Sequence, residues 1–307
     1  MPKKKKSKQV EEIQETENTG LNINWYPGHM VKAQNAIKSA LKLIDIVVEV
    51  LDARIPLSSR NPIIDELAKD KERIIVLNKA DLADEKVTSS WIKYFESLNY
   101  SCLAVDSSIP QDIKKIISEI NKKGEIVYRE KVKSLDIDYK PIYRVLIAGI
   151  PNVGKSTIIN KIAKRNAANV SNKPGDTVRN QWIRVEDNIE LLDTPGLLWP
   201  RLEDNRAGEK LALTGNIKQE ILDLEGLACI GIEYLLSNEE YKAMFLDKYK
   251  IDEEILEYSD SYDILENLGR KRGCLISGGN VDTEKASKIF LDELKAGKIG
   301  RISLESI

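Results

Sequence analysis

The segment GIPNVGKST, residues 149–157, has the glycine, lysine and hydroxyl spacing of a phosphate-binding loop. Gly149 and Gly154 allow backbone N–H groups to close around a phosphate, and the helix that follows adds partial positive charge. Lys155 would reach the β- and γ-phosphates of a nucleotide, and Ser156 would ligate Mg²⁺. An apolar strand precedes the segment and a helical pattern follows it, which is the context that this motif requires.

Two further segments have the chemistry of nucleotide switches. The segment DTPG, residues 193–196, ends another apolar strand. The carboxylate of Asp193 would hold Mg²⁺, usually through water, and the N–H of Gly196 would face the γ-phosphate. Between the two motifs lies KPGDT, where Thr177 is the candidate that closes on Mg²⁺ when the γ-phosphate is present. Ser171 is a second hydroxyl in the same loop and leaves this choice open.

The segment NKAD, residues 78–81, predicts recognition of guanine. The carboxylate of Asp81 would accept hydrogen bonds from guanine N1–H and from the exocyclic amine. Adenine has no such pair of donors, so it would leave the carboxylate unpaired. Asn78 and Lys79 would support the loop and the O6 side of the base. After the next strand, Asp106-Ser107-Ser108 stands where a backbone N–H would contact guanine O6.

The order of these motifs is unusual, because the base motif precedes the phosphate loop. No second NKxD segment occurs after Gly196. Either one motif is accidental or the domain is circularly permuted, and the agreement of the other motifs favours permutation. The termini of a domain often lie close together, so such a rejoining is feasible. The chain after residue 196 would then run directly into whatever follows the nucleotide domain.

The remaining pattern predicts an α/β domain with a mostly parallel sheet, followed by an α-helical domain. Continuous apolar runs indicate strands buried on both faces, and helical periods alternate with them. After Gly196 the alternation stops and helical periods dominate. We expect strands over 45–54, 73–78, 101–105 and 143–148, a hairpin over 181–186 and 189–193, helices over 31–44, 61–70, 84–98 and 111–122, and a connector over 123–142.

The predicted organisation is a basic, disordered tail (1–20), a permuted nucleotide domain (21–205) and a helical domain (206–307). The net charge is −2, with 42% hydrophobic and 31% charged residues, which is typical of a soluble globular protein. No apolar run is long enough to span a membrane. The three cysteines form no CxxC pair, so we expect free thiols in a reducing cytoplasm. The lysine-rich tail either contacts nucleic acid or is solvated and binds nothing.

The sequence resembles the circularly permuted GTPases of the ribosome biogenesis GTPase A type. The resemblance rests on NWYPGHMVKA, LDARIP, NKAD, GIPNVGKS, KPGDT, DTPG, RGCLISGG and GKIGRIS. It implies GTP and GDP as ligands with Mg²⁺, and a GTP-dependent role late in the assembly of the large ribosomal subunit. It also implies a helical domain that contacts ribosomal RNA, and neither a membrane nor DNA as partner. The expected GTP contacts are Asn78, Lys79, Asp81, Asp106, Ser107, Ser108, Pro151, Asn152, Val153, Gly154, Lys155, Ser156, Thr157, Thr177, Asp193 and Gly196, with Ser156, Thr177 and Asp193 as ligands of Mg²⁺.

Turnover is expected to be slow without a partner. The position after DTPG normally holds a glutamine that orients water, whereas this chain has Leu197. By the resemblance, Asn152 matches an asparagine that holds K⁺ beside the phosphates, although it could equally be a loop former. His29 is the only histidine, and it either positions water or serves packing or an RNA contact. The expected catalytic groups are Lys155, Thr177, Gly196 and His29.

Other features leave alternatives open. Arg54 fits a structural or interface role better than that of an arginine finger, because it follows a strand on the base side. Residues 270–272, Arg-Lys-Arg, suit RNA phosphates or a solvated helix end, and Trp25 and Tyr26 suit base stacking or core packing. A GTP-regulated scaffold with negligible catalysis is the competing function. An ATP-dependent enzyme is a third, and it would leave Asp81 without a role.

Overall fold

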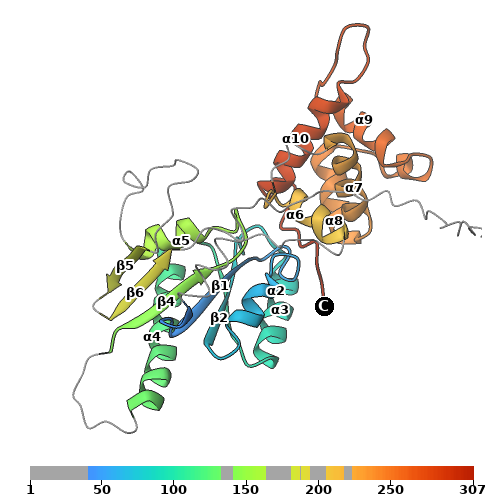
Figure 1. Cartoon of the computed structure of the whole chain (residues 1–307). Coiled ribbons are helices and arrows are strands. Elements are labelled where there is room, and N and C mark those ends of the chain that lie inside the picture. Colours follow the sequence, from blue (N-terminus) through green and yellow to red (C-terminus); the bar gives the residue numbers. More distant parts are fainter. Residues whose placement is uncertain (1–40, 133–140, 164–180, 187, 194–204, 218–222) are drawn as a thin grey trace, which may run out of the picture.

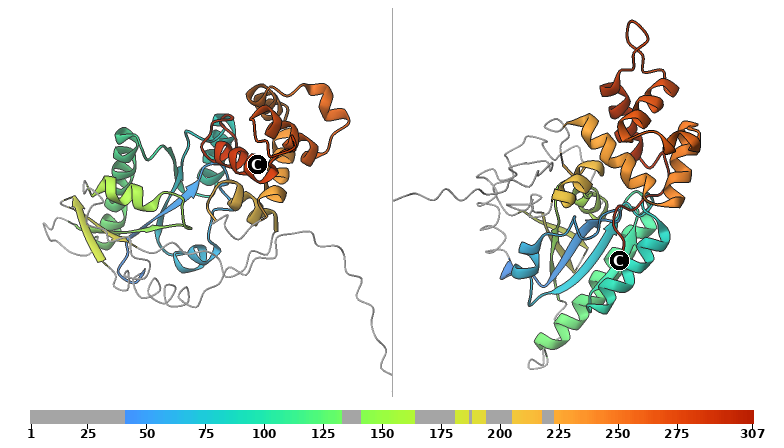
Figure 2. Two further views of the ribbon diagram at one scale, coloured as in Figure 1. Left: turned by 90° about the horizontal axis from the view of Figure 1, so that it is seen from above. Right: turned by 90° about the vertical axis from the view of Figure 1, so that its right-hand side faces the viewer.

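The computed structural model describes residues 41–132, 141–163, 181–186, 188–193, 205–217 and 223–307. The predicted tail (1–20) lies outside these residues, as does the predicted helix over 31–44 up to residue 40. In the part that is described, a sheet with helices on both faces is joined to a cluster of helices. Figures 1 and 2 show the helical cluster at one end of the sheet, with the C-terminus returning beside α3.

The sheet has six strands in the order β3-β2-β1-β4-β6-β5. All neighbouring pairs are parallel except β5 and β6, which form the predicted hairpin. This confirms a mostly parallel α/β sheet. The strand bounds are β1 Ile46–Asp52, β2 Glu72–Asn78, β3 Ser101–Val105, β4 Tyr143–Ala148, β5 Gln181–Glu186 and β6 Ile189–Asp193.

The continuous apolar run of β1 explains why this strand lies at the centre. Val48 and Val50 face the core that α4 (Pro110–Val132) and α5 (Lys155–Ile162) cover. Val47 packs on the opposite face with α2 (Pro62–Leu67), and Leu51 packs there with α3 (Glu85–Ser97). Every residue of β1 is buried, as expected for a parallel strand covered on both sides.

The topological switch point of the sheet lies between β1 and β4. These strands are neighbours, but the chain leaves β1 towards β2 and leaves β4 towards β6. In open α/β sheets, ligands bind outside the carboxyl ends of the strands at such a switch point. The phosphate loop follows β4, and the base motif ends β2. The register aligns Asp52 with Asn78 and Asn78 with Val105, so the candidate residues of these strands share one edge.

The prediction of a connector over 123–142 was wrong for its first half, because α4 continues to Val132. The sequence hides this extension, since few of its residues are apolar. Lys123 pairs with Glu72 at 2.8 Å, and Tyr128 packs against the core. A Cβ on Gly124 would lie 2.5 Å from the Tyr143 ring, so the helix passes very close to β4. Tertiary contacts, and not an apolar period, therefore carry this part of the helix.

The helical domain packs around α7 (Leu224–Leu236). It contains α6 (Asn205–Leu213), α8 (Glu239–Tyr249), η3 (Glu253–Glu257), α9 (Ser261–Lys271) and α10 (Thr283–Lys295). The side chain of Asp282 caps the start of α10 by accepting from Lys285 N, and Gly297 follows the end of this helix at φ +67°. Leu211 of α6 belongs to the sheet core whereas Leu213 belongs to the helical core. The boundary at residue 206 stays a prediction.

The described residues also bear on the predicted thiols and membrane segments. Cys102, Cys229 and Cys274 are free, as predicted. Burial raises the pKa of the Cys102 thiol to about 12, so this thiol is inert at neutral pH. Among the described helices, none combines the length and apolar character needed to cross a bilayer.

Candidate functional site

The phosphate loop connects β4 to α5 through residues whose backbone only glycine accommodates. Gly154 is the N-cap of α5 and has φ +100°. A Cβ at Gly154 would lie 2.1 Å from Nδ2 of Asn78, and one at Gly149 would lie 2.4 Å from the Val50 carbonyl oxygen. No side chain caps the helix, so its first N–H groups have no side-chain acceptor. The loop can therefore offer backbone donors to an anion.

The polar side chains of this loop have different surroundings. Nζ of Lys155 donates to the Ile150 carbonyl at 2.7 Å, and the residue is only 7% exposed. This ammonium therefore lies over the loop that would hold the phosphates. Ser156 and Thr157 are exposed at the start of α5. Val153 is fully buried in the sheet core, so only its backbone can serve a nucleotide.

Asn78 connects the base motif to both neighbouring loops. Its Nδ2 donates to the Val153 carbonyl at 2.7 Å, and its Oδ1 accepts from Ser107 N at 3.2 Å. The side chain is almost fully buried. Both ends of this amide are thus occupied by protein, which agrees with the predicted supporting role. Asn78 fixes the distance between the phosphate loop and the predicted base-side loop.

The N–H groups of the base-side loop already have acceptors within the protein. Asp106 N donates to Oδ2 of Asp112 at 2.8 Å, and Ser108 N donates to Oδ1 of Asp106 at 2.7 Å. The third N–H, that of Ser107, is held by Asn78. A contact from this loop to guanine O6 would therefore have to share or exchange one of these bonds.

Asp81 lies exposed in the loop that follows β2. Partial burial raises the pKa of its carboxyl, and the negative charge of Asp106 raises it further. Arg54 and Arg301 act in the opposite direction. A carboxylate with a raised pKa gains from hydrogen-bond donors that face it, and the N1–H and amine of guanine are such donors.

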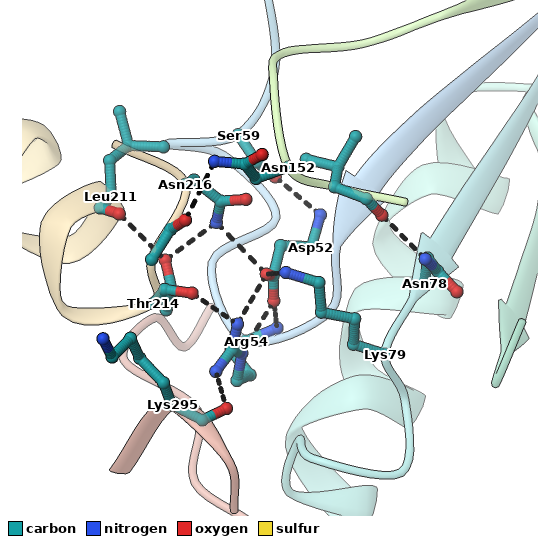
Figure 3. Close-up of polar contacts among 12 residues, drawn as sticks. Asp52, Arg54, Ser59, Asn78, Lys79, Asn152, Leu211, Thr214, Asn216 and Lys295 are labelled. Carbon is teal, nitrogen blue, oxygen red and sulfur yellow. Dashed lines mark hydrogen bonds and ion pairs between the residues drawn. The ribbon is translucent and has the colours of Figure 1, made fainter. Parts of the chain in front are cut away.

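Asp52, at the end of β1, is the centre of a buried polar network (Figure 3). Arg54 donates to its carboxylate from Nε at 2.9 Å and from Nη2 at 2.8 Å, and Nζ of Lys79 lies 2.8 Å from Oδ2. Nδ2 of Asn216 adds a third partner at 3.1 Å. Burial alone would raise the pKa of Asp52, but the two cations outweigh it and hold the pKa far below its usual value. Lys79 of the base motif is thus held in place by an ion pair with Asp52.

The same network joins the nucleotide domain to the helical domain. Arg54 donates to the carbonyl of Thr214 at 2.9 Å and to that of Lys295 at 3.1 Å. Nδ2 of Asn152, in the phosphate loop, donates to the carbonyl of Gly215 at 3.2 Å (Figure 3). Arg54 is 4% exposed, so its guanidinium is an interface group and is not presented to a phosphate. This agrees with the structural role favoured for Arg54.

Comparison with known proteins gives a consistent family. A protein-family model described as "50S ribosome-binding GTPase" matches residues 144–264. Ribosome biogenesis GTPase A of Bacillus cereus is 43% identical and covers 92% of this chain and 94% of its own length. The chain belongs to the ribosome biogenesis GTPase A family. It is therefore a GTPase with a circularly permuted domain.

Two solved structures extend this family likeness to three dimensions. GNP-bound YlqF from T. maritima is 32% identical with a TM-score of 0.59, and covers 90% of this chain and 100% of its own. GDP-bound TM YlqF is 31% identical with a TM-score of 0.60, and covers 88% of this chain and 98% of its own. These ligands agree with the predicted binding of GTP and GDP by this member of the ribosome biogenesis GTPase A family.

Several predicted residues of this GTPase fall outside the described part of the chain. They are His29, Thr177, Gly196 and Leu197, together with the segment 173–177. Asp193 is described only by its backbone, which ends β6 opposite Ile147 of β4. The described part therefore brings together the base motif, the base-side loop and the phosphate loop, and it places the end of β6 one strand away.

Sequence reasoning missed the residues that hold these loops together. Asp52, Thr214 and Asn216 belong to the buried network, and Arg301 and Glu305 reach the nucleotide domain from the C-terminal segment. One signal was present, because Asp52 is a charged residue at the end of an otherwise apolar run. The partners of these residues are distant in sequence, and no local pattern identifies them.

Proposed function

We propose that this GTPase is an assembly factor of the large ribosomal subunit. Its GTP form binds the immature subunit late in maturation, and it leaves after hydrolysis that the ribosome stimulates. The supporting observation is that the 50S ribosome-binding GTPase match extends past the phosphate loop to residue 264, within α9 of the helical domain. In this proposal residues 206–307 contact ribosomal RNA, and the protein works in the cytoplasm.

Base recognition is assigned to the loop after β2. Asp81 accepts from N1–H and the exocyclic amine of guanine, and the exposed position of its carboxylate supports this role. Asn78 and Lys79 hold the loop through Val153, Ser107 and Asp52, at 2.7, 3.2 and 2.8 Å. Asp106, Ser107 and Ser108 border the base. Guanine is selected because adenine would leave the Asp81 carboxylate without donors.

The phosphates are assigned to the turn between β4 and α5. The backbone N–H groups of residues 152–154 surround the β-phosphate, and Lys155 exchanges the Ile150 carbonyl for the β- and γ-phosphates. Mg²⁺ would neutralise charge that develops during phosphoryl transfer. The exposed hydroxyl of Ser156 fits one ligand position, and Thr157 borders the same phosphates. Mg²⁺ is usually held by one or two protein ligands together with phosphates and water, so few protein ligands are needed here.

The residues of the hydrolysis step extend this assignment. Asp193 and Thr177 complete the Mg²⁺ ligands, and the N–H of Gly196 meets the γ-phosphate. Leu197 offers no hydrogen bond to water, so unstimulated turnover is slow. His29 positions the attacking water when the ribosome is bound. His29→Ala should lower ribosome-stimulated kcat and leave GTP affinity unchanged, whereas loss of GTP affinity would indicate a structural role.

K⁺ is assigned to Asn152. With Nδ2 engaged by Gly215, the Oδ1 atom is what this amide can offer to a cation. A bound K⁺ would neutralise charge on the phosphates as an arginine finger does. The Gly215 carbonyl of the helical domain orients the Asn152 amide for this role.

A sucrose-gradient experiment tests the proposed client. The protein is mixed with large-subunit precursors in a non-hydrolysable GTP analogue or in GDP, and its sedimentation is followed. We expect co-sedimentation with the analogue only. No co-sedimentation in either state would overturn the ribosomal proposal and favour the competing GTP-regulated scaffold. An Asp81→Asn variant should shift preference towards xanthosine nucleotides, and an unchanged preference would overturn the base assignment.

A further inference from the structure

The chain after α10 returns to the nucleotide domain and runs along the loop that follows β2. We call residues 297–305 the C-terminal strap. Ile302 N donates to the Leu82 carbonyl at 3.0 Å, and Oγ of Ser303 accepts from Asp84 N at 3.1 Å. Leu304 N donates to the Arg54 carbonyl at 2.9 Å. The strap thus contacts the base loop through the Ile302 backbone and the Ser303 hydroxyl, and it also contacts Arg54, which holds Asp52.

The far end of the strap is anchored by a carboxylate. Glu305 accepts from Leu57 N at 2.7 Å and from Ser58 N at 3.1 Å, and Ser58 Oγ donates to it as well. Lys210 of α6 lies 3.4 Å from the same carboxylate. Trp91 of α3 donates from Nε1 to the Glu305 carbonyl at 3.2 Å. Because these anchors lie on several elements, the strap has a fixed path across the nucleotide domain.

Arg301 is the side chain of the strap that contacts the base loop most directly. Its Nε donates to the Ala83 carbonyl at 2.7 Å, and its Nη2 donates to the Ala80 carbonyl at 2.9 Å. These two alanines enclose Asp81 in the sequence. The third nitrogen, Nη1, lies 3.4 Å from the exposed carboxylate of Glu85. One planar guanidinium therefore spans the backbone of the loop that carries the base-reading carboxylate.

We propose that Arg301 is a positioning residue for the guanine-recognition loop, and that the C-terminal strap makes guanine affinity depend on the placement of the helical domain. The proposal rests on the assignment of Asp81 as the reader of guanine. The loop needs such support, because Lys79 at its start is in the left-handed region at φ +60°. Two charge-assisted bonds to the carbonyls around Asp81 hold the carboxylate where the base arrives.

Linkage gives this contact a functional consequence. A binding partner that moves the strap changes the affinity for GTP and GDP, and either nucleotide changes the affinity for that partner by the same factor. The route passes through the base loop, which touches guanine in both nucleotide states. This coupling between the strap and the nucleotide would therefore act on GTP and GDP alike. A coupling through segments that respond to the γ-phosphate would distinguish the two nucleotides.

The test is a comparison of nucleotide affinities in the full chain. Arg301→Ala should weaken GTP and GDP by about tenfold each, because a hydrogen bond to a charged group is worth about that factor. The weak affinity for ADP, which gains nothing from Asp81, should stay unchanged, as should kcat at saturating GTP. In Arg301→Lys the ammonium can reach one carbonyl at a time. The GTP and GDP affinities of this variant should therefore lie between those of the wild type and those of Arg301→Ala. Isothermal calorimetry measures the affinities, and thermal unfolding verifies that each variant is folded.

Two controls separate the possible causes. Arg270→Ala removes a cation that pairs with Glu266, at 3.7 Å on the same helix, and it should leave all affinities unchanged. Glu85→Gln removes the exposed ion pair of Arg301 while keeping its carbonyl bonds, and it should also have little effect.

Two results would contradict the inference. They are unchanged GDP affinity in Arg301→Ala, whether or not GTP affinity falls, and equal losses of GDP and ADP affinity. If Asp81→Asn gains xanthosine diphosphate affinity while Arg301→Ala has no effect, only this inference fails. If Asp81→Asn gains none, the base assignment beneath it fails as well.

Discussion

Asn78 donates from Nδ2 to the Val153 carbonyl at 2.7 Å, and so joins the base motif directly to the phosphate loop. The same amide accepts from Ser107 N. One buried side chain therefore fixes the spacing between three loops that follow three different strands. Changes at this amide should consequently act on stability and on nucleotide binding together.

Asn78→Ala should weaken both the fold and nucleotide binding. The change leaves the buried Val153 carbonyl and the partly buried Ser107 N–H without the Asn78 side chain as partner, which costs about 1–3 kcal/mol of unfolding free energy. We expect GDP affinity to fall by roughly tenfold or more, because the two loops lose their common spacer. Urea unfolding and a GDP titration measure the two effects. Asn188→Ala, which removes a 2.7 Å bond to Asn121 at the β5–β6 turn, should leave GDP affinity unchanged.

Gly154→Ala should damage the site beyond the strain of its backbone. A Cβ there would lie 2.1 Å from Nδ2 of Asn78, so the Asn78 bonds must break or the loop must move. We expect GDP affinity to fall roughly ten- to a hundredfold, equivalent to the 1–3 kcal/mol that overpacking costs. Gly273→Ala is the matched control, because Gly273 has φ +67° with no atom within 4 Å of the added Cβ. Equal GDP affinities in the two variants would show that the clash is relieved elsewhere.

Asp52→Asn should destabilise the protein at neutral pH and matter less in acid. The variant leaves Arg54 without its buried counter-ion, which costs about 3–5 kcal/mol. The pKa of Asp52 is held below its usual value of 3.8, so the unfolded chain binds the proton first. Its contribution is therefore present above about pH 4 and is lost as the pH falls towards the depressed value. Urea unfolding should show a smaller difference in unfolding free energy between this variant and the wild type at pH 3 than at pH 7.

A surface carboxylate provides the contrast for Asp52. Asp247 also has a lowered pKa, caused by its hydrogen bond and ion pair with Lys250, but it is fully exposed. We expect Asp247→Asn to change stability at neither pH. If Asp52→Asn behaved in the same way, the buried network would not contribute to the stability of the fold.

As the pH falls, the affinity for guanine nucleotides should begin to weaken at a higher pH than it would with an aspartate of ordinary pKa. Partial burial and the charge of Asp106 raise the pKa of Asp81, and a protonated carboxyl cannot accept from both guanine donors. Asp106→Asn removes the neighbouring charge, lowers the pKa of Asp81, and should preserve GDP affinity to lower pH. Calorimetric titration of GDP across the acid range measures the midpoint. A midpoint at higher pH in the variant would contradict the assignment of Asp81.

Replacing K⁺ with Na⁺ should slow ribosome-stimulated GTP hydrolysis in the wild type and not in Asn152→Ala. The physical reason is that the amide oxygen is needed to hold the cation. Asn152→Asp keeps an acceptor oxygen but loses the donor to the Gly215 carbonyl, so it separates cation binding from the domain contact. We expect it to retain a K⁺ preference. An unchanged wild-type rate in Na⁺ would eliminate the role of Asn152 in K⁺ binding.

The parts of this fold that sequence predicts are those with local causes. β1 reads as a buried strand because every residue from Ile46 to Leu51 except Glu49 is apolar, and α10 reads as a helix because Asp282 and Gly297 mark its ends. The phosphate loop and the base motif are compact, so their chemistry is visible in a few adjacent letters. The edge they share follows from the rule for parallel strands.

The parts that sequence does not predict have non-local causes. The second half of α4 is held by Lys123 on Glu72 and by Tyr128 on the core, not by a clear apolar face. Arg301 lies in a segment without helical or strand period, and its partners are backbone carbonyls, which every residue possesses. Asp52 stands out as a charge at a strand end, but no local pattern marks the distant residues that surround it.

The contact between Asp84 and Ser303 joins positions 219 residues apart. Translation adds about 5–20 residues per second. After the base loop is synthesised, roughly ten seconds or more therefore pass before the ribosome has made the segment that fastens it. Within that interval a nascent chain can complete its sheet and phosphate loop and still lack the contact between the C-terminal strap and the base loop. If the strap positions the base loop as proposed, a newly made molecule therefore reaches its full affinity for guanine nucleotides only at the end of its synthesis.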